Sequence, residues 1–155
     1  GKNLPHNYED RDFVSSSLPE VKQIIRERNE QYDMCGWKYP AAANYLDQVA
    51  RDLRAPQLII VFRDVVATMQ HHVRSNSFDA MTVLSRVMLQ HQMNVSIAMR
   101  WNAPTLLVSY EKAIMSPISV VSDLANFVGV PVPEDMSSFE AFLKPGKYKT
   151  FGEQG

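Results

Sequence analysis

This 155-residue chain has little cysteine, little glycine and no long hydrophobic segment. Its single cysteine, Cys35, excludes a disulfide within the chain, and no cysteine–histidine spacing typical of a zinc site is present. Sparse cysteine favours a reducing compartment, so we predict a cytoplasmic protein. No apolar run approaches the ~18 residues of a membrane-spanning helix, so no membrane span is expected.

The chain also lacks an excess of charge of either sign. Sixteen Lys and Arg stand against 17 Asp and Glu, a formal net charge of −1, which argues against nucleic acid or a membrane surface as the main partner. The chain length fits one domain over residues 1–155, which would bury roughly 68–70% of its unfolded surface.

Apolar periodicity predicts helices that alternate with short strands. Such an order favours an α/β fold with a mostly parallel sheet flanked by helices. The strands are expected over 34–38, 57–62 and 105–109. The helices are expected over 12–17, from the N-cap Ser17 onward, over 41–53, from Asp64 to a break at 75–77, along the segment that follows this break, over 116–128 with Gly129 as C′ residue, and over 135–143.

A short apolar run over 58–62 ends directly at Arg63. The run is too short for a buried helix and is typical of an inner strand that is covered on both faces. Open α/β sheets bind ligands just past the carboxyl ends of their strands, and a guanidinium suits a phosphate. Arg63 is therefore a candidate phosphate ligand, with a structural salt bridge to a helix carboxylate as the alternative.

Other candidates carry charge near expected element ends. Lys38, at the end of the 34–38 strand, could neutralise charge on a transferred group, or be a solvated lysine. Lys144, Lys147 and Lys149 could close over a phosphate through Gly146, although a charged C-terminal tail is the commoner explanation.

The remaining candidates have a structural alternative each. His71 and His72, in the helix after Arg63, are more often surface residues than ligands. Glu9 and Asp10 could act as a general base or could cap a turn.

Two further features of the sequence concern the long helix and the third expected strand. Tyr110-Glu111 follows that strand and could be catalytic by position, or could favour a helix dipole. The methionine-rich face of the long helix, at Met81, Met88, Met93 and Met99, is predicted to be core.

Four segments, in this order, resemble elements of one known family. They are Asn7-Tyr8-Glu9-Asp10-Arg11-Asp12-Phe13, Gly36-Trp37-Lys38-Tyr39-Pro40, Ile59 to Asp64, and Ser109-Tyr110-Glu111-Lys112 with Ser116-Pro117 and Leu124 to Val130 after it. The family is the sulfotransferase superfamily, whose members transfer a sulfuryl group from 3′-phosphoadenosine 5′-phosphosulfate. The resemblance implies a P-loop NTPase-like architecture, this nucleotide as co-substrate, no metal, and a hydroxyl or amine acceptor that the sequence does not name.

The resemblance also assigns roles to residues. Arg63 would contact the 3′-phosphate, and His71 stands where the family has a serine that shares it. Lys38 would lie near the sulfuryl group, and Glu9 would be an acceptor-side carboxylate. Outside the matched segments, Lys147 of the basic tail is a further candidate for a cofactor contact.

Besides His71, the chain departs from the family pattern in three places. Val65 replaces a proline, Tyr39 replaces an acidic residue, and the Ser-Gly-Thr-Thr type phosphate loop is absent. By this comparison a strand, a loop and a helix, roughly 20–35 residues, are expected before Gly1. The alternative function is a non-catalytic binding or interaction module that keeps the fold without the loop. A P-loop kinase relative fits less well, since no Walker-type lysine loop is evident.

Overall fold

The computed structural model describes residues 10–14, 16–76 and 79–137. Its internal contacts divide the chain into two compact units. The first unit combines the residues up to Pro56 with 93–104, and the second combines 57–92 with the residues from Thr105 onward. The fold is mixed α/β.

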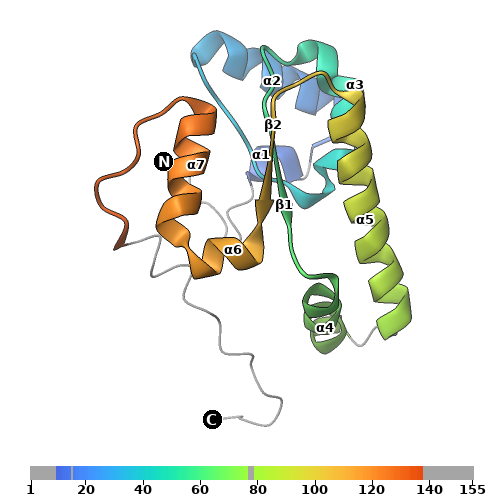
Figure 1. The fold of residues 1–155 in the computed structure, drawn as a ribbon. Coiled ribbons are helices and arrows are strands. Elements are labelled where there is room, and N and C mark those ends of the chain that lie inside the picture. The colour runs from blue at the N-terminus through green and yellow to red at the C-terminus, as the bar shows by residue number, and fades with distance from the viewer. Residues whose placement is uncertain (1–9, 15, 77–78, 138–155) are drawn as a thin grey trace, which may run out of the picture. The chain divides into compact units, whose positions relative to one another are not determined.

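The second unit contains a parallel pair of strands, β1 (Leu58–Phe62) and β2 (Thr105–Ser109), which Figure 1 shows side by side. Their register pairs Phe62 with Ser109, so both strands end at the same edge. The expected strands at 57–62 and 105–109, and their parallel pairing, are confirmed. The helices of this unit are α4 (Val65–Asn76), α6 (Tyr110–Met115), α7 (Pro117–Val128) and the first part of α5 (Ala80–Arg100), whose residues from Met93 onward belong to the first unit.

Among the described residues, only one face of β1 is packed. Ile60 is buried, and the ring of Phe62 meets His91 of α5 edge to face, with 5.2 Å between the ring centroids. Ile59 and Val61 point to the opposite face, because side chains alternate along a strand, and both are exposed. The expectation of a strand covered on both faces is therefore wrong for the described part of the chain.

The methionine-rich face of α5 is not core. At 3.6 residues per turn, three of its methionines fall on the side of the helix opposite to Val83 and Ile97, which are buried. Because α5 is apolar on both sides, periodicity alone does not tell which side packs. The prediction is therefore wrong for Met81 (67% exposed), Met88 (58%) and Met99 (82%), whereas Met93 is half-buried.

The first unit has a small core of Phe13, Val21, Ile25 and Val49. The Ser17 start of the second helix is confirmed as a capping box with Glu20, which satisfies main-chain N–H groups that the first turn leaves free. The elements of this unit are α1 (Arg11–Val14), α2 (Leu18–Gln31), η1 (Pro40–Asn44), α3 (Leu46–Val49) and η2 (Ala50–Asp52).

Two expectations for this unit are wrong. Residues 34–38 form no strand, because Trp37 is held by its side chain: its ring stacks on Phe13 at 4.3 Å, and its indole N–H donates to the hydroxyl of Tyr45 at 3.0 Å. The helix expected over 41–53 is instead three short segments, since Tyr45 leaves the helical conformation with φ −127 and ψ −8.

Two other expected helix positions agree more closely with the structure. The helix over 12–17 is present as α1, one residue earlier and shorter, and Gly129 ends α7 with φ 75. Most of the helix expected over 135–143 lies outside the described residues.

Candidate functional site

The candidate site lies at the carboxyl edge of the parallel strands. Arg63 follows β1 and Tyr110 follows β2, and the parallel register makes the two residues neighbours. The guanidinium carbon of Arg63 lies 4.7 Å from the centroid of the Tyr110 ring, a cation–π contact between two half-buried side chains. Among the described residues, no carboxylate forms an ion pair with Arg63. The partner of Arg63 in this part of the chain is a ring.

Glu111 joins the ends of the two strands. Its Oε1 accepts the main-chain N–H of Asp64 at 2.8 Å, and its Oε2 accepts the hydroxyl of Ser109 at 3.2 Å. The bond from the Asp64 N–H is the main reason that the pKa of Glu111 lies below its ordinary value. A carboxylate with a lowered pKa is a poor general base, so Glu111 acts here as a fixed acceptor.

Asp64 fixes the start of α4 directly after Arg63. Its Oδ1 accepts the N–H of Ala67 at 2.7 Å, and its main-chain carbonyl accepts the hydroxyl of Thr68 at 2.9 Å. An acidic residue that caps a helix in this way satisfies a first-turn N–H group. Arg63 is thus held between a strand end and a capped helix start.

The other predicted site residues lie further along α4, in the first unit, or outside the described residues. His71 is an exposed residue of α4, about 9 Å along the helix axis from Val65, and its ring meets His72 edge to face. Lys38 is exposed in the irregular segment before η1, in the first unit. Glu9 and Lys147 lie outside the described residues.

Sequence reasoning found Tyr110 and Glu111 by their place after a strand but missed their partners. The sequence could have predicted that Arg63 and Tyr110 are neighbours, because two parallel strands of equal length put the residues that follow them at one edge. The side-chain geometry was not available, so the stacking of Tyr110 on Arg63 is new.

The carboxylates near the start of the first unit have a structural role. Asp10 and Asp12 form ion pairs with Arg28 at 2.6 and 3.1 Å, and Asp10 also accepts the N–H of Asp12 at 3.0 Å. The guanidinium of Arg28 lies over the ring of Phe13, 4.8 Å from its centroid. These contacts tie α1 to α2, so for Asp10 they favour the turn role over that of a base.

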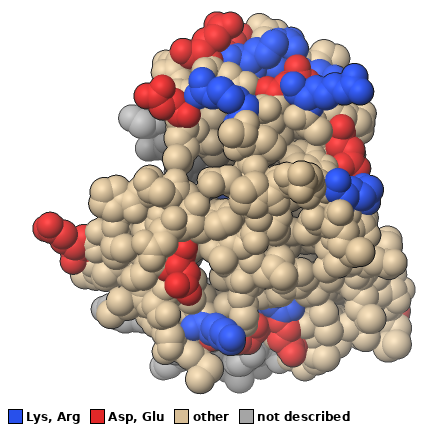
Figure 2. Space-filling view, turned by 45° about the horizontal axis from the view of Figure 1, so that its top comes forward, with Lys and Arg blue, Asp and Glu red and all other residues tan. Residues whose placement is uncertain are grey.

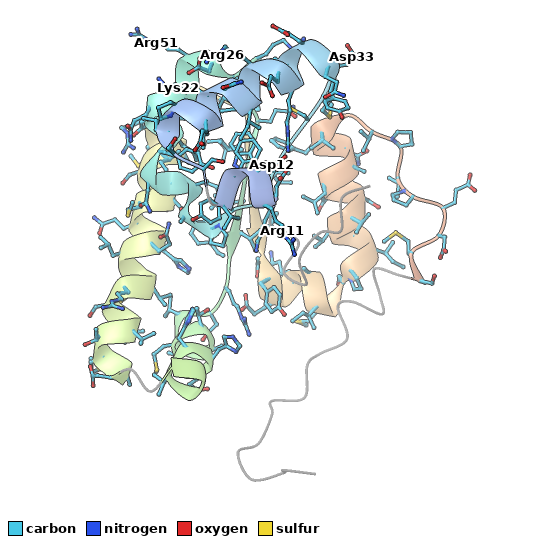
Figure 3. All side chains as sticks on the ribbon, turned by 180° about the vertical axis from the view of Figure 1, so that it is seen from behind. Arg11, Asp12, Lys22, Arg26, Asp33 and Arg51 are labelled. Carbon is cyan, nitrogen blue, oxygen red and sulfur yellow. The ribbon has the colours of Figure 1, made fainter. Side chains whose placement is uncertain are left out.

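The surface of α2 carries charges of both signs, which Figure 2 shows as mixed blue and red atoms. Lys22 and Arg26 both contact Asp52, at 3.8 and 3.2 Å, and Figure 3 labels them together with Arg51 of the neighbouring η2. Because Asp52 offsets this positive charge and the side chains are exposed, the surface is a weaker anion site than the edge at Arg63.

A shallow hollow of about 270 Å³ lies at the end of α5 in the first unit, and Arg100 and Trp101 belong to its lining. Both side chains are already engaged by Asp47: Arg100 Nη2 lies 2.6 Å from Oδ2, and the Trp101 indole N–H donates to Oδ1 at 2.7 Å. The hydrogen bond from Trp101 is the main cause that lowers the pKa of Asp47. The hollow therefore offers few free polar groups to a ligand.

Within the described ranges, no three His, Cys, Asp or Glu side chains are arranged to hold a metal ion. No helix in those ranges is both long and apolar enough to cross a membrane. A comparison of the chain with protein-family models, curated proteins and solved structures gave no match.

Proposed function

We propose that the chain is a sulfotransferase-type domain, which transfers a sulfuryl group from 3′-phosphoadenosine 5′-phosphosulfate to a hydroxyl or amine acceptor. One observation carries the proposal. Arg63 stands at the carboxyl end of a parallel strand, is held there by the ring of Tyr110, and has no carboxylate partner among the described residues.

The chemistry of Arg63 supports a phosphate ligand. A guanidinium presents five N–H donors in a planar fork that matches a phosphate group. A carboxylate partner would use two of these donors. An aromatic ring instead contacts the guanidinium without accepting a directed hydrogen bond from each N–H. Ligands of open α/β sheets bind at this edge, so we assign Arg63 to the 3′-phosphate of the nucleotide.

The remaining roles follow the resemblance of the sequence for Lys38, Glu9 and His71, and the basic C-terminal tail for Lys147. In the proposed reaction a base takes the proton of the acceptor, the acceptor oxygen or nitrogen bonds to sulfur, and the bond from sulfur to the 5′-phosphate oxygen breaks. The products are the sulfated acceptor and adenosine 3′,5′-bisphosphate. Lys38 would stabilise the transferred group, Glu9 would act on the acceptor side, and His71 and Lys147 would add cofactor contacts.

The second candidate function is a nucleotide-binding module without transfer. The observation that favours it concerns Lys38. Its expected role in neutralising charge on a transferred group depended on a strand that ends at this residue, and residues 34–38 form no strand. In this alternative the Arg63 edge binds the nucleotide and no chemistry follows.

Calorimetry tests the binding claim, with adenosine 3′,5′-bisphosphate titrated into the full chain. Arg63→Ala is expected to weaken binding about 10- to 100-fold, the effect of a lost hydrogen-bonded charge. Arg51→Ala removes an exposed arginine elsewhere and is expected to leave affinity unchanged. A wild-type chain that does not bind, or an Arg63→Ala variant that binds equally well, overturns the proposal.

An activity assay separates the two candidates. Wild-type protein with 3′-phosphoadenosine 5′-phosphosulfate and a panel of phenol, sugar and amine acceptors should release adenosine 3′,5′-bisphosphate only when an acceptor is present. Binding without any acceptor-dependent release supports the module.

A further inference from the structure

We infer that Tyr110 is a positioning residue, whose ring holds the Arg63 guanidinium ready to receive the 3′-phosphate. The inference rests on the proposed function, because it assigns Tyr110 a task in the same site. Its ground is the 4.7 Å contact between the Arg63 guanidinium and the Tyr110 ring.

The sheet fixes this contact. Phe62 and Ser109 are register partners in the parallel pair, and Arg63 and Tyr110 are the next residue of each chain segment. The Glu111–Asp64 hydrogen bond, at 2.8 Å, ties the following residues together. The ring and the guanidinium are therefore brought together by paired backbones rather than by a free loop.

The competing partners of Arg63 at this edge are already engaged. Asp64 accepts the N–H of Ala67 at 2.7 Å, and Glu111 accepts the N–H of Asp64 and the hydroxyl of Ser109. A carboxylate that took the guanidinium in a bidentate pair would compete with an incoming phosphate. The ring keeps Arg63 ordered without such competition.

An ordered arginine binds an anion more tightly, since the free side chain has many rotamers to lose. An exposed cation–π contact changes an equilibrium by about two- to fivefold, and a desolvated one by about 30-fold. For this half-buried pair we expect the loss of the ring to weaken binding about three- to tenfold.

The experiment measures affinities for adenosine 3′,5′-bisphosphate and for adenosine 5′-monophosphate, which lacks the 3′-phosphate. Tyr110→Phe keeps the ring and should bind both as wild type does. Tyr110→Leu should weaken only the bisphosphate, by about three- to tenfold. In an Arg63→Ala background, Tyr110→Leu should have no further effect, because the two residues act as a unit.

Each other outcome decides the matter. A Tyr110→Leu effect that persists for the monophosphate, or in the Arg63→Ala background, shows that Tyr110 contacts the nucleotide itself and overturns the inference. Binding that depends on Arg63 and is indifferent to Tyr110 overturns the inference alone and leaves the proposed function standing. A wild-type chain without bisphosphate binding overturns both. Where thermal unfolding shows that Tyr110→Leu is unfolded, Tyr110→Met removes the ring with an unbranched side chain and serves in its place.

Discussion

The carboxylate of Glu111 accepts a hydrogen bond from the main-chain N–H of Asp64, with 2.8 Å between the two atoms. The bond spans 47 residues of sequence and joins the start of α6 to the residue that caps α4. It closes the edge of the sheet at which Arg63 and Tyr110 meet. The strand ends of the second unit are thus held by side chains as well as by the strand pairing.

Replacement of Glu111 by Gln should destabilise the protein at neutral pH by about 0.5–1 kcal/mol, the value of a charge-assisted bond after allowance for its exposure. The pKa of Glu111 is lowered in the folded state, mainly by the Asp64 N–H. Its contribution is therefore present above the ordinary carboxyl value of 4.5 and is lost as pH falls through the folded-state pKa.

Urea unfolding of wild type and Glu111→Gln at pH 7 and pH 3 measures how much Glu111 contributes to the free energy of unfolding at each pH. The difference in free energy of unfolding should shrink at pH 3. Glu134→Gln changes an exposed carboxylate of the second unit and should have little effect at either pH. A Glu111→Gln difference that grows on acidification contradicts the account.

Replacement of Phe13 by Ala should cost about 3–5 kcal/mol of unfolding free energy, the usual loss for a buried aromatic ring. Phe13 is 1% exposed, stacks on Trp37 and lies under the guanidinium of Arg28. Denaturant unfolding followed by tryptophan fluorescence measures the loss. The neighbouring Val14→Ala, at an exposed position, should change stability by about 0.5 kcal/mol or less, and equal losses for the two variants would disprove the packing described for Phe13.

Replacement of Gly129 by Ala should destabilise the protein by about 1–2 kcal/mol. No atom lies within 4 Å of an added Cβ at this position, so the effect comes from the backbone, which has φ 75. Gly36 has an equally open surrounding and no such positive φ, so Gly36→Ala is the matched control and should be neutral or slightly stabilising. Thermal unfolding compares them, and a destabilisation as large at Gly36 as at Gly129 would rule out the conformational explanation.

Removal of the indole N–H of Trp101 should raise the pKa of Asp47, and so should removal of the Arg100 guanidinium. The hydrogen bond from Trp101 is the largest single cause that lowers this pKa, and Arg100 lowers it both by a hydrogen bond and by its charge. Carboxyl NMR titrations of Trp101→Phe and Arg100→Met measure both changes. An unchanged pKa of Asp47 in either variant would contradict the contacts described for this carboxylate.

Features that a few neighbouring residues determine were predictable from the sequence. Ser17 and Glu20 predict a helix start, and Gly129 predicts a helix end, because helix caps use only local backbone groups. The apolar runs at 58–62 and 105–109 predicted two short strands. The helices between these runs predicted that the strands pair in parallel.

Features that depend on distant contacts were not predictable. Trp37 packs on Phe13, 24 positions earlier, and this packing rather than a strand pairing holds residues 34–38. The sequence of α5 is apolar on two sides, so periodicity gave the wrong face to Met81 and Met99. At the site, the order of elements placed Arg63 and Tyr110 at one edge, whereas their stacking needed side-chain coordinates.

The most direct test of the central claim is a ratio of two affinities, measured by calorimetry on wild type and on Arg63→Ala. The ratio compares adenosine 3′,5′-bisphosphate with adenosine 5′-monophosphate and so isolates the 3′-phosphate. We expect wild type to prefer the bisphosphate by about tenfold or more and Arg63→Ala to bind both nucleotides equally. A preference that survives in Arg63→Ala would contradict the assignment of Arg63 to the 3′-phosphate.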